Sequence, residues 1–237
     1  MIIAHDAAAR LDPTGAVAPQ LYRLLREAII QGEMEPGTRI SESEIATRYA
    51  VSRQPVREAF IKLAEDGLLE VRPQRGTFVC KISVDSVMDA RFVREAIEAD
   101  IVKALAADPD AALVRDLMAQ IEEQRVVAGR DSVAFIRLDE RFHRTLAEGA
   151  GRSHAWRVVE GQKVQMDRVR HLATRRFPMA ALVEQHGAIV HAIGRGDIAG
   201  AEQAMRLHLR AILTDLPEVV RDLPNFFEAA RTPGRLY

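Results

Sequence analysis

Four side chains in the second half of the sequence are of the kinds that bind divalent metals. Asp139 and His143 are four residues apart, so on a helix they lie on one face. His186 and His208 follow on later segments, each on a stripe of apolar residues. A buried carboxylate needs a compensating charge, and a metal cation supplies it together with neutral imidazoles. The set predicts a site for zinc, nickel, manganese or iron, with one position open for water or a ligand carboxylate.

The other histidines fit such a site less well. His5 lies in the N-terminal tail, and His191 is turned away from His186 on the same predicted helix. His154 and His171 lie at opposite ends of another predicted helix. Taken singly, an inward-facing histidine is more often a hydrogen-bonded core residue than a metal ligand. Only the combination of one aspartate with three histidines on three helices favours a metal site.

Helices must position these side chains, and the sequence from Asp85 onward reads as a succession of amphipathic helices. Asp-Pro, Gly-Arg, Phe-Pro and Gly-Asp pairs separate the apolar stripes and mark the boundaries, with Asp108 as the expected cap of the second helix. The six predicted helices cover residues 85–105, 108–129, 131–148, 153–173, 178–193 and 197–216. They predict an all-α six-helix bundle as a domain over residues 83–222.

The first third of the chain predicts three helices followed by a hairpin. The expected elements are helices 19–32, 41–49 and 52–66 and strands 68–71 and 77–82. This order, over residues 16–82, is typical of a winged helix-turn-helix, whose third helix enters the major groove of DNA. Arg53 and Arg57 lie one turn apart near the start of that helix, where the helix dipole favours phosphate. Spacing alone gives equal weight to arginines that only keep an exposed helix solvated.

The first domain carries a recognisable series of motifs. They are Leu25-Arg26-Glu27-Ala28-Ile29-Ile30-Gln31-Gly32, Pro36-Gly37-Thr38, Ser41-Glu42-Ser43-Glu44-Ile45-Ala46, Val51-Ser52-Arg53-Gln54-Pro55-Val56-Arg57-Glu58-Ala59 and Arg75-Gly76-Thr77. This series closely resembles the GntR family of bacterial transcription regulators. The resemblance implies that Ser52, Arg53 and Arg57 contact operator DNA and that Gly76 in the wing approaches its backbone. Arg75, beside that glycine, is a further expected DNA-binding residue.

A second series of motifs runs through the predicted bundle. They are Arg94-Glu95-Ala96-Ile97-Glu98, Asp139-Glu140-Arg141-Phe142-His143, Glu184-Gln185-His186 and Ala204-Met205-Arg206-Leu207-His208. This series resembles the FadR C-terminal ligand-binding (FCD) domain, and the six predicted helices are similar to its VanR-type subgroup. The resemblance implies that Asp139, His143, His186 and His208 bind a divalent metal. It also implies that a small organic acid binds at or beside that metal.

Arginines are the expected partners of an effector carboxylate. Arg94 stands where members of the resembled family often have such an arginine. Arg168 is the second effector-binding residue that we expect, on the predicted helix 153–173. Arg170, two residues further on, cannot share its face, and a place on the surface or at a dimer edge fits either residue about as well. Aromatic residues are only 5% of the chain, which argues against an aromatic cage.

Composition excludes several other classes of protein. Hydrophobic residues are 48% and charged residues 28%, and no apolar run approaches the roughly 20 residues that span a bilayer. The 33 basic and 34 acidic residues nearly balance, so a nucleic-acid site must be local. Cys80 is the single cysteine, which excludes an intrachain disulfide and a zinc finger. Residues 1–10 lack a secretory signal pattern, so we expect a frayed N-terminus and a cytoplasmic protein.

The sequence therefore predicts a homodimeric transcription factor, a repressor by analogy with most relatives, that binds a palindromic operator. A small carboxylic acid at a divalent metal, with zinc as the first choice, is expected to control operator affinity. Two alternatives stay open: a metal-responsive regulator without an organic effector, and a metallohydrolase with an accessory DNA-binding domain. Glu140, Glu148 and Glu184 are the carboxylates available as a general base for the latter.

Overall fold

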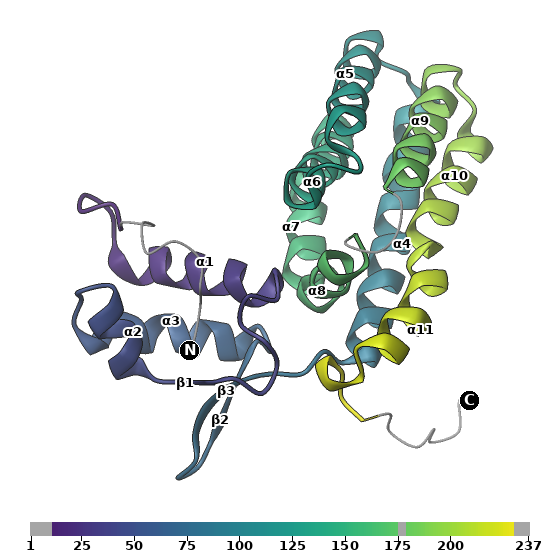
Figure 1. The fold of residues 1–237 in the computed structure, drawn as a ribbon. Helices are drawn as coiled ribbons and strands as arrows, with labels where there is room; N and C mark the ends of the chain where they lie inside the picture. Colours follow the sequence, from purple (N-terminus) through teal and green to yellow (C-terminus); the bar gives the residue numbers. More distant parts are fainter. Residues whose placement is uncertain (1–10, 175–178, 230–237) are drawn as a thin grey trace. The chain divides into compact units, whose positions relative to one another are not determined.

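The computed structural model describes residues 11–174 and 179–229, and Figure 1 shows their helices and strands. The expected fraying of residues 1–10 lies outside the described part. The described residues form two compact units: Asp85–Asp222 is one, and residues 11–84 and 223–229 together form the other. Among the described residues, no helix combines the length and apolar character needed to cross a lipid bilayer.

The first unit confirms the predicted winged helix-turn-helix. Its elements are α1 (Val17–Ile30), β1 (Arg39–Ile40), α2 (Glu42–Arg48), α3 (Arg53–Glu65), β2 (Leu69–Arg72) and β3 (Gly76–Val79). Ser41 caps α2, because its Oγ accepts hydrogen bonds from the amides of Ser43 at 3.2 Å and Glu44 at 3.5 Å. Leu21 of α1 and Leu63 of α3 are fully buried, and the two helices pack against each other through such apolar side chains.

The wing is the hairpin of β2 and β3. These strands belong to a three-stranded antiparallel sheet in the order β1–β3–β2. Arg39 lies opposite Phe78, and Arg72 lies opposite Gly76. The turn between β2 and β3 contains Gln74 with a left-handed φ of 60°. The sequence did not predict β1, because a strand of two residues is too short to show alternation.

The second unit is all-helical, as predicted, but the described residues form eight helices rather than six. They are α4 (Val84–Ala107), α5 (Ala111–Val127), α6 (Ser132–Gly149), α7 (Ser153–Gln162), α8 (Val164–Ala173), α9 (Ala180–Gly194), α10 (Ile198–Arg210) and α11 (Ile212–Asp222). The predicted helix 153–173 is divided at Lys163, and the predicted helix 197–216 is divided at Ala211. The predicted count of six is therefore wrong, and the VanR-type subgroup, which depended on it, stays a prediction.

The second unit differs from the sequence prediction at the two divisions, at the end of α11 and at the cap of α5. The apolar periodicity continues through both divisions, so it does not reveal them. At the first division the Lys163 ammonium is buried and lies 2.7 Å from Asp167, one turn into α8. Pro217 does not end α11, which continues through it to Asp222. Asp110, rather than the expected Asp108, caps α5.

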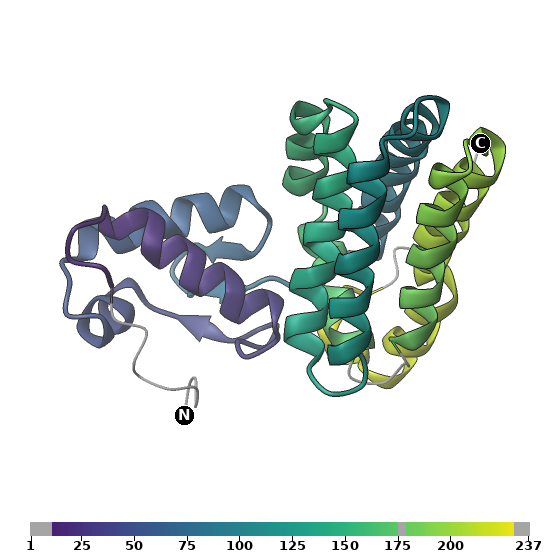
Figure 2. The same cartoon turned by 90° about the horizontal axis from the view of Figure 1, so that it is seen from above.

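The core of the second unit lies among its long helices, which run side by side in Figure 2. α9 packs on α10, and α5 packs on both α6 and α9. Phe135 and Phe142 of α6 and Ile193 of α9 have no exposed surface and belong to one apolar cluster. The inner faces of α6, α9 and α10 are therefore apolar except where the charged and imidazole side chains described below interrupt them.

The segment after α11 returns to the first unit. A short 3-10 helix, η1 (Pro224–Phe226), leads into a parallel β-bridge between Phe227 and Ile82. The Ile82 amide donates to Phe226 O at 2.8 Å, and the Glu228 amide donates to Ile82 O at 3.0 Å. Ile82 is 1% exposed and Phe227 is 2% exposed, so the contact is well packed. The sequence alone did not indicate where this segment packs.

Candidate metal centre and DNA-binding surface

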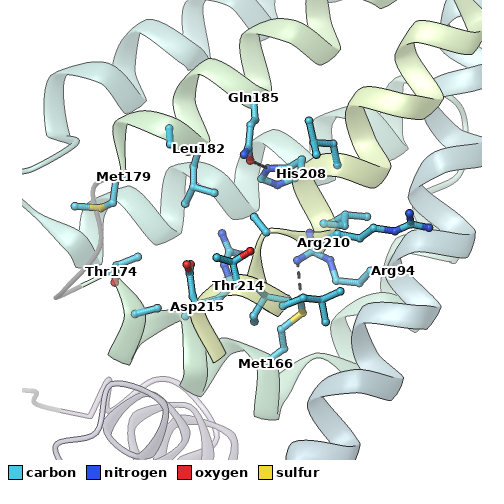
Figure 3. Close-up of a pocket in the computed structure, with 18 residues that line it drawn as sticks. Arg94, Met166, Thr174, Met179, Leu182, Gln185, His208, Arg210, Thr214 and Asp215 are labelled. Carbon is cyan, nitrogen blue, oxygen red and sulfur yellow. Dashed lines mark hydrogen bonds between the residues drawn. The ribbon is translucent and has the colours of Figure 1, made fainter. Parts of the chain in front are cut away.

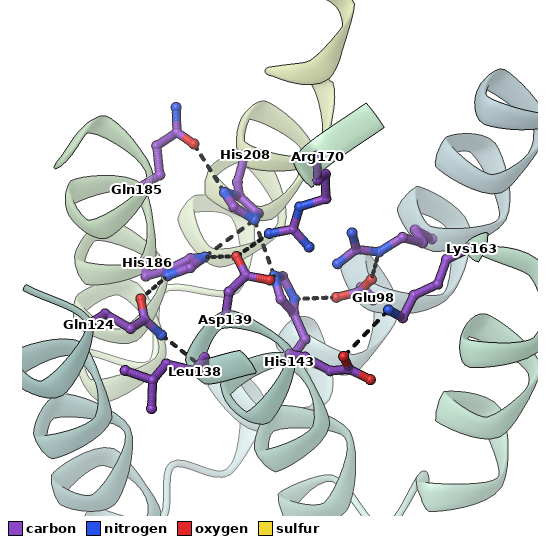
Figure 4. Close-up of polar contacts among 12 residues, drawn as sticks. Glu98, Gln124, Leu138, Asp139, His143, Lys163, Arg170, Gln185, His186 and His208 are labelled. Carbon is purple, nitrogen blue, oxygen red and sulfur yellow. Dashed lines mark hydrogen bonds and ion pairs between the residues drawn. The ribbon is translucent and has the colours of Figure 1, made fainter. Parts of the chain in front are cut away.

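Four buried side chains of the second unit point toward a common centre in Figure 4. They are Asp139 and His143 of α6, His186 of α9 and His208 of α10. One ligand atom from each lies within 4.8 Å of those of the others. His208 Nε2 is 3.1 Å from His143 Nε2 and 3.3 Å from His186 Nε2. The structure thus brings together all four residues expected to bind metal.

The outer nitrogen of each histidine faces an oxygen acceptor. His186 Nδ1 lies 2.6 Å from Gln124 Oε1, and the amide of Gln124 is oriented by its own donation to Leu138 O at 3.4 Å. His208 Nδ1 lies 3.0 Å from Gln185 Oε1. A carbonyl oxygen only accepts, so these Nδ1 atoms carry the protons and the Nε2 lone pairs face the centre.

The inner nitrogens of the cluster lack hydrogen-bond donors. Two Nε2 lone pairs 3.1–3.3 Å apart cannot hydrogen-bond to each other, and the fully buried carboxylate of Asp139 faces them, 3.9 Å from His143 Nε2 and 3.5 Å from His186 Nε2. Three imidazole nitrogens and one carboxylate are also a ligand set that zinc and similar divalent metals take. These side chains therefore fit a divalent cation.

Burial and neighbouring charges set the protonation of the cluster. Burial by itself would raise the pKa of Asp139, but Arg170, followed by His143 and His186, lowers this pKa well below its ordinary value. Burial lowers the pKa of His186 to about 3 and holds that of His208 well below its ordinary value. At neutral pH the aspartate is ionised and these two histidines are neutral, as metal ligation requires.

Two buried or nearly buried arginines pair with carboxylates at the cluster. A terminal guanidinium nitrogen of Arg170 lies 2.5 Å from Asp139 Oδ1. Arg94 Nε donates to Glu98 Oε1 at 2.6 Å, and the other oxygen of Glu98 lies 2.5 Å from His143 Nδ1. Burial opposes the ionisation of Glu98, but Arg94 and His143 lower its pKa to about 2. The cluster and the arginines therefore form one continuous charged network.

A cavity of about 620 Å³ adjoins this network (Figure 3). Its polar lining includes Arg94, Arg170, Gln185, His208, Thr214 and Asp215. Arg94 therefore lies where an effector-binding residue was expected. Arg168 does not line the cavity, and one of its guanidinium nitrogens donates to Gln165 Oε1 at 3.1 Å. The opposite face of α8, which carries Arg170, is the one that meets the cavity.

Sequence reasoning missed three residues that support the histidines: Glu98, Gln124 and Gln185. Glu98 could have been found from its position one turn after Arg94. Gln124 continues the buried stripe of Leu117 and Ile121, and a polar residue on such a stripe signals a buried partner. Gln185 carries no comparable signal, because only the packing of α9 against α10 brings it to His208.

Gln124→Leu is expected to weaken zinc binding by about 10- to 100-fold, because His186 loses the acceptor that fixes its Nδ1 proton. Calorimetric titration of zinc into chelator-treated protein measures this loss. Gln120→Leu is the matched control, since Gln120 is buried on the same helix but bonds to Asp116 and Thr145. An equal loss in both variants would show that general damage to α5, and not the His186 contact, is responsible.

The start of α3 presents the expected DNA-binding residues at the surface. Ser52 occupies the N-cap position, yet its exposed side chain makes no capping hydrogen bond. The Arg53 side chain is 68% exposed, and its guanidinium lies 3.3 Å from Glu42 on α2. Arg57 is also exposed, one turn later. These side chains lie at the end of the helix whose dipole attracts phosphate.

The wing carries the other two expected residues. Arg75 is exposed in the turn before β3. Gly76 has a φ of 109°, a conformation that side chains rarely adopt, and a Cβ there would lie 2.8 Å from Arg39 Nε. Glycine is thus required by the backbone of the wing, whether or not DNA approaches it.

The fold and this surface define a winged-helix DNA-binding protein with a helical second domain, and comparisons agree. Residues 18–79 match the model described as "Bacterial regulatory proteins, gntR family", and residues 89–211 match the "FCD domain". The chain is 38% identical over 220 residues to the HTH-type transcriptional repressor RspR of Escherichia coli, covering 92% of this chain and 96% of that protein. It is 31% identical to a probable D-xylose utilization operon transcriptional repressor of Paenarthrobacter nicotinovorans, covering 88% and 92% respectively. A putative GntR regulator from Rhodococcus sp. RHA1 is structurally similar, with a TM-score of 0.70, 25% identity and coverage of 85% and 97%.

The chain therefore belongs to the GntR family of bacterial transcriptional regulators, with an FCD domain behind the winged helix. It is a regulator and not an enzyme, so the metallohydrolase alternative is set aside.

Proposed function

We propose that this regulator is a repressor whose affinity for its operator is controlled by a small organic acid bound at a divalent metal in the second domain. The observation that carries this proposal is the convergence of three imidazole Nε2 atoms and one fully buried carboxylate beside a 620 Å³ cavity. The repressor sense is supported by the names of two relatives. Zinc is the first choice of metal, with nickel, manganese and iron as alternatives.

Asp139, His143, His186 and His208 would hold the cation. A divalent metal that accepts a further ligand beyond these four would supply a Lewis-acidic centre for a carboxylate. Arg94 and Arg170 line the adjoining cavity and supply guanidinium donors for the same kind of group. Arg168 is not carried into this proposal, because it lies outside the cavity lining.

DNA recognition is assigned to the first domain. In this proposal Ser52, Arg53 and Arg57 enter the major groove from α3, and Arg75 and Gly76 follow the neighbouring backbone from the wing. A homodimer would present two such surfaces to the two halves of a palindromic operator.

Two segments of the chain run from the cavity lining to the first domain, and either can transmit the binding of a ligand in the cavity. Arg94 and Glu98 lie on α4, which begins at Val84, directly after the first domain. The first turn of α11 also lines the cavity, and the chain leaving α11 forms the bridge to Ile82. Both helices therefore lead to the same pair of backbone hydrogen bonds, at the C-terminal end of the wing.

Glu228→Pro is expected to weaken this connection, because proline lacks the amide that donates to Ile82 O. Hydrogen exchange should then be faster at Ile82. The response of the wing amides to manganese and succinate added together should also shrink relative to the wild type. Glu228→Ala keeps the amide and is the control. Equal wing responses in the two variants would show that the signal does not pass through this bridge.

A metal-responsive regulator without an organic effector is the second candidate, supported by the same ligand cluster. A thermal-shift screen of small carboxylic acids against metal-loaded protein separates the two. Ligand at a hundred times its dissociation constant adds about 2.7 kcal/mol to stability. An acid whose effect disappears after chelation and in His143→Ala supports the proposal. If no acid shifts the melting temperature while chelation lowers it, the metal-only candidate is favoured.

A further inference from the structure

The charges around the metal ligands balance before any cation is added. Asp139 and Glu98 contribute two negative charges, and Arg170 and Arg94, which contact them, contribute two positive charges. Asp139 and Glu98 are 0% and 2% exposed, and Arg94 is 3% exposed. A histidine that ligates a metal does so in its neutral form and adds no charge. A divalent cation bound by these ligands therefore carries two positive charges that the surrounding side chains do not neutralise.

An uncompensated charge is costly where water is largely excluded. Lys163 and Asp167, the nearest buried pair on α8, neutralise each other and offer no compensation. Arg210, which also lines the cavity, pairs with the buried Glu95, and the Arg210 side chain is itself 54% exposed. Asp215 is the carboxylate among the described residues of the cavity lining, and burial raises its pKa. The rest of the balance must then come from an anion that enters the cavity.

Arg170 connects the metal ligands with the cavity through a contact to a proposed ligand carboxylate. Its guanidinium contacts the metal-binding carboxylate of Asp139, and its side chain also lines the cavity. When Asp139 shares its charge with a cation, less of that charge is left to compensate Arg170. Arg170 then attracts an anion in the cavity more strongly.

We propose that Arg170 sets the charge of the effector, so that the metal-loaded cavity takes a dianion, such as a short dicarboxylate, in preference to a monoanion of the same length. This inference rests on the proposed metal centre and adds the charge class of its ligand and the residue that selects it. One carboxylate is expected at the metal position and the second at Arg170.

The test compares acids of equal chain length and different charge. Succinate and butyrate, glutarate and valerate, and malonate and propionate are titrated calorimetrically into manganese-loaded full-length protein. The wild type is expected to prefer at least one dicarboxylate over its partner by about tenfold or more. Arg170→Gln is expected to reduce that preference to about threefold or less, the range of a weak, screened pair.

Arg168→Gln is the matched control, because Arg168 is a buried arginine on the same helix that does not line the cavity. It should keep the preference of the wild type. Circular dichroism and manganese binding show that each variant is folded. If neither zinc nor manganese binds the wild type, the proposed metal centre is refuted. If manganese binds but no dicarboxylate is preferred, or both arginine variants lose the preference equally, the role of Arg170 is refuted and the metal centre stands.

Discussion

His186→Ala is expected to reduce zinc affinity strongly, because it removes a metal ligand. The loss should exceed the roughly 10- to 100-fold that follows removal of a group that only supports a ligand. His186 contributes one of three converging Nε2 atoms, and its pKa of about 3 keeps it in the neutral form that binds metal at neutral pH. No other histidine on α9 can replace it, because His191 is exposed and lies outside the cluster. Competition with a chromogenic chelator measures the change.

His191→Ala serves as the control for this experiment. It removes an imidazole from the same helix at an exposed position, so zinc affinity and stoichiometry should stay at the values of the wild type. The account would be contradicted if His186→Ala bound zinc as tightly as His191→Ala while remaining folded.

The double substitution of Arg53 and Arg57 by alanine is expected to remove specific operator binding. A bidentate arginine–guanine contact contributes about 1–3 kcal/mol of discrimination, so two independent contacts account for about 2–6 kcal/mol. Both side chains are exposed at the start of α3, so their removal leaves the apolar face of the helix intact. Fluorescence anisotropy with a duplex selected from a random library by the wild type measures the effect.

Lys62→Ala is the control for charge, because Lys62 carries the same charge at the opposite end of α3. It should lower binding to all sequences modestly and leave the preference for the selected duplex unchanged. If the double arginine variant kept its preference over a scrambled duplex, the assignment of base recognition to these residues would be wrong.

The fold followed from the sequence wherever local signals were strong. Ser41 and Gly67 mark the ends of helices in the first domain, and apolar stripes mark α1, α3 and α6. The signals failed where structure depends on distant partners. β1 exists through its pairing with β3, and the division at Lys163 gives no break in the apolar pattern. The bridge from Phe227 to Ile82 joins segments far apart in the chain, and periodicity carries no information about it.

The candidate metal ligands were accessible to sequence reasoning because Asp139 and His143 share a helical face, while His186 and His208 interrupt apolar stripes. The sequence could not decide which of Arg168 and Arg170 faces the cavity. Alternate residues of one helix face different ways, and only the packing of α8 decides which of them meets the cavity.

The most direct test of the central proposal is operator affinity measured by anisotropy in four conditions: chelated protein, metal alone, dicarboxylate alone, and both together. The account predicts that only the last condition changes affinity substantially. A coupling of about 1–3 kcal/mol corresponds to a change of roughly 5- to 150-fold. The same change with the acid in chelated protein, or with the metal alone, would contradict control by an organic acid bound at the metal.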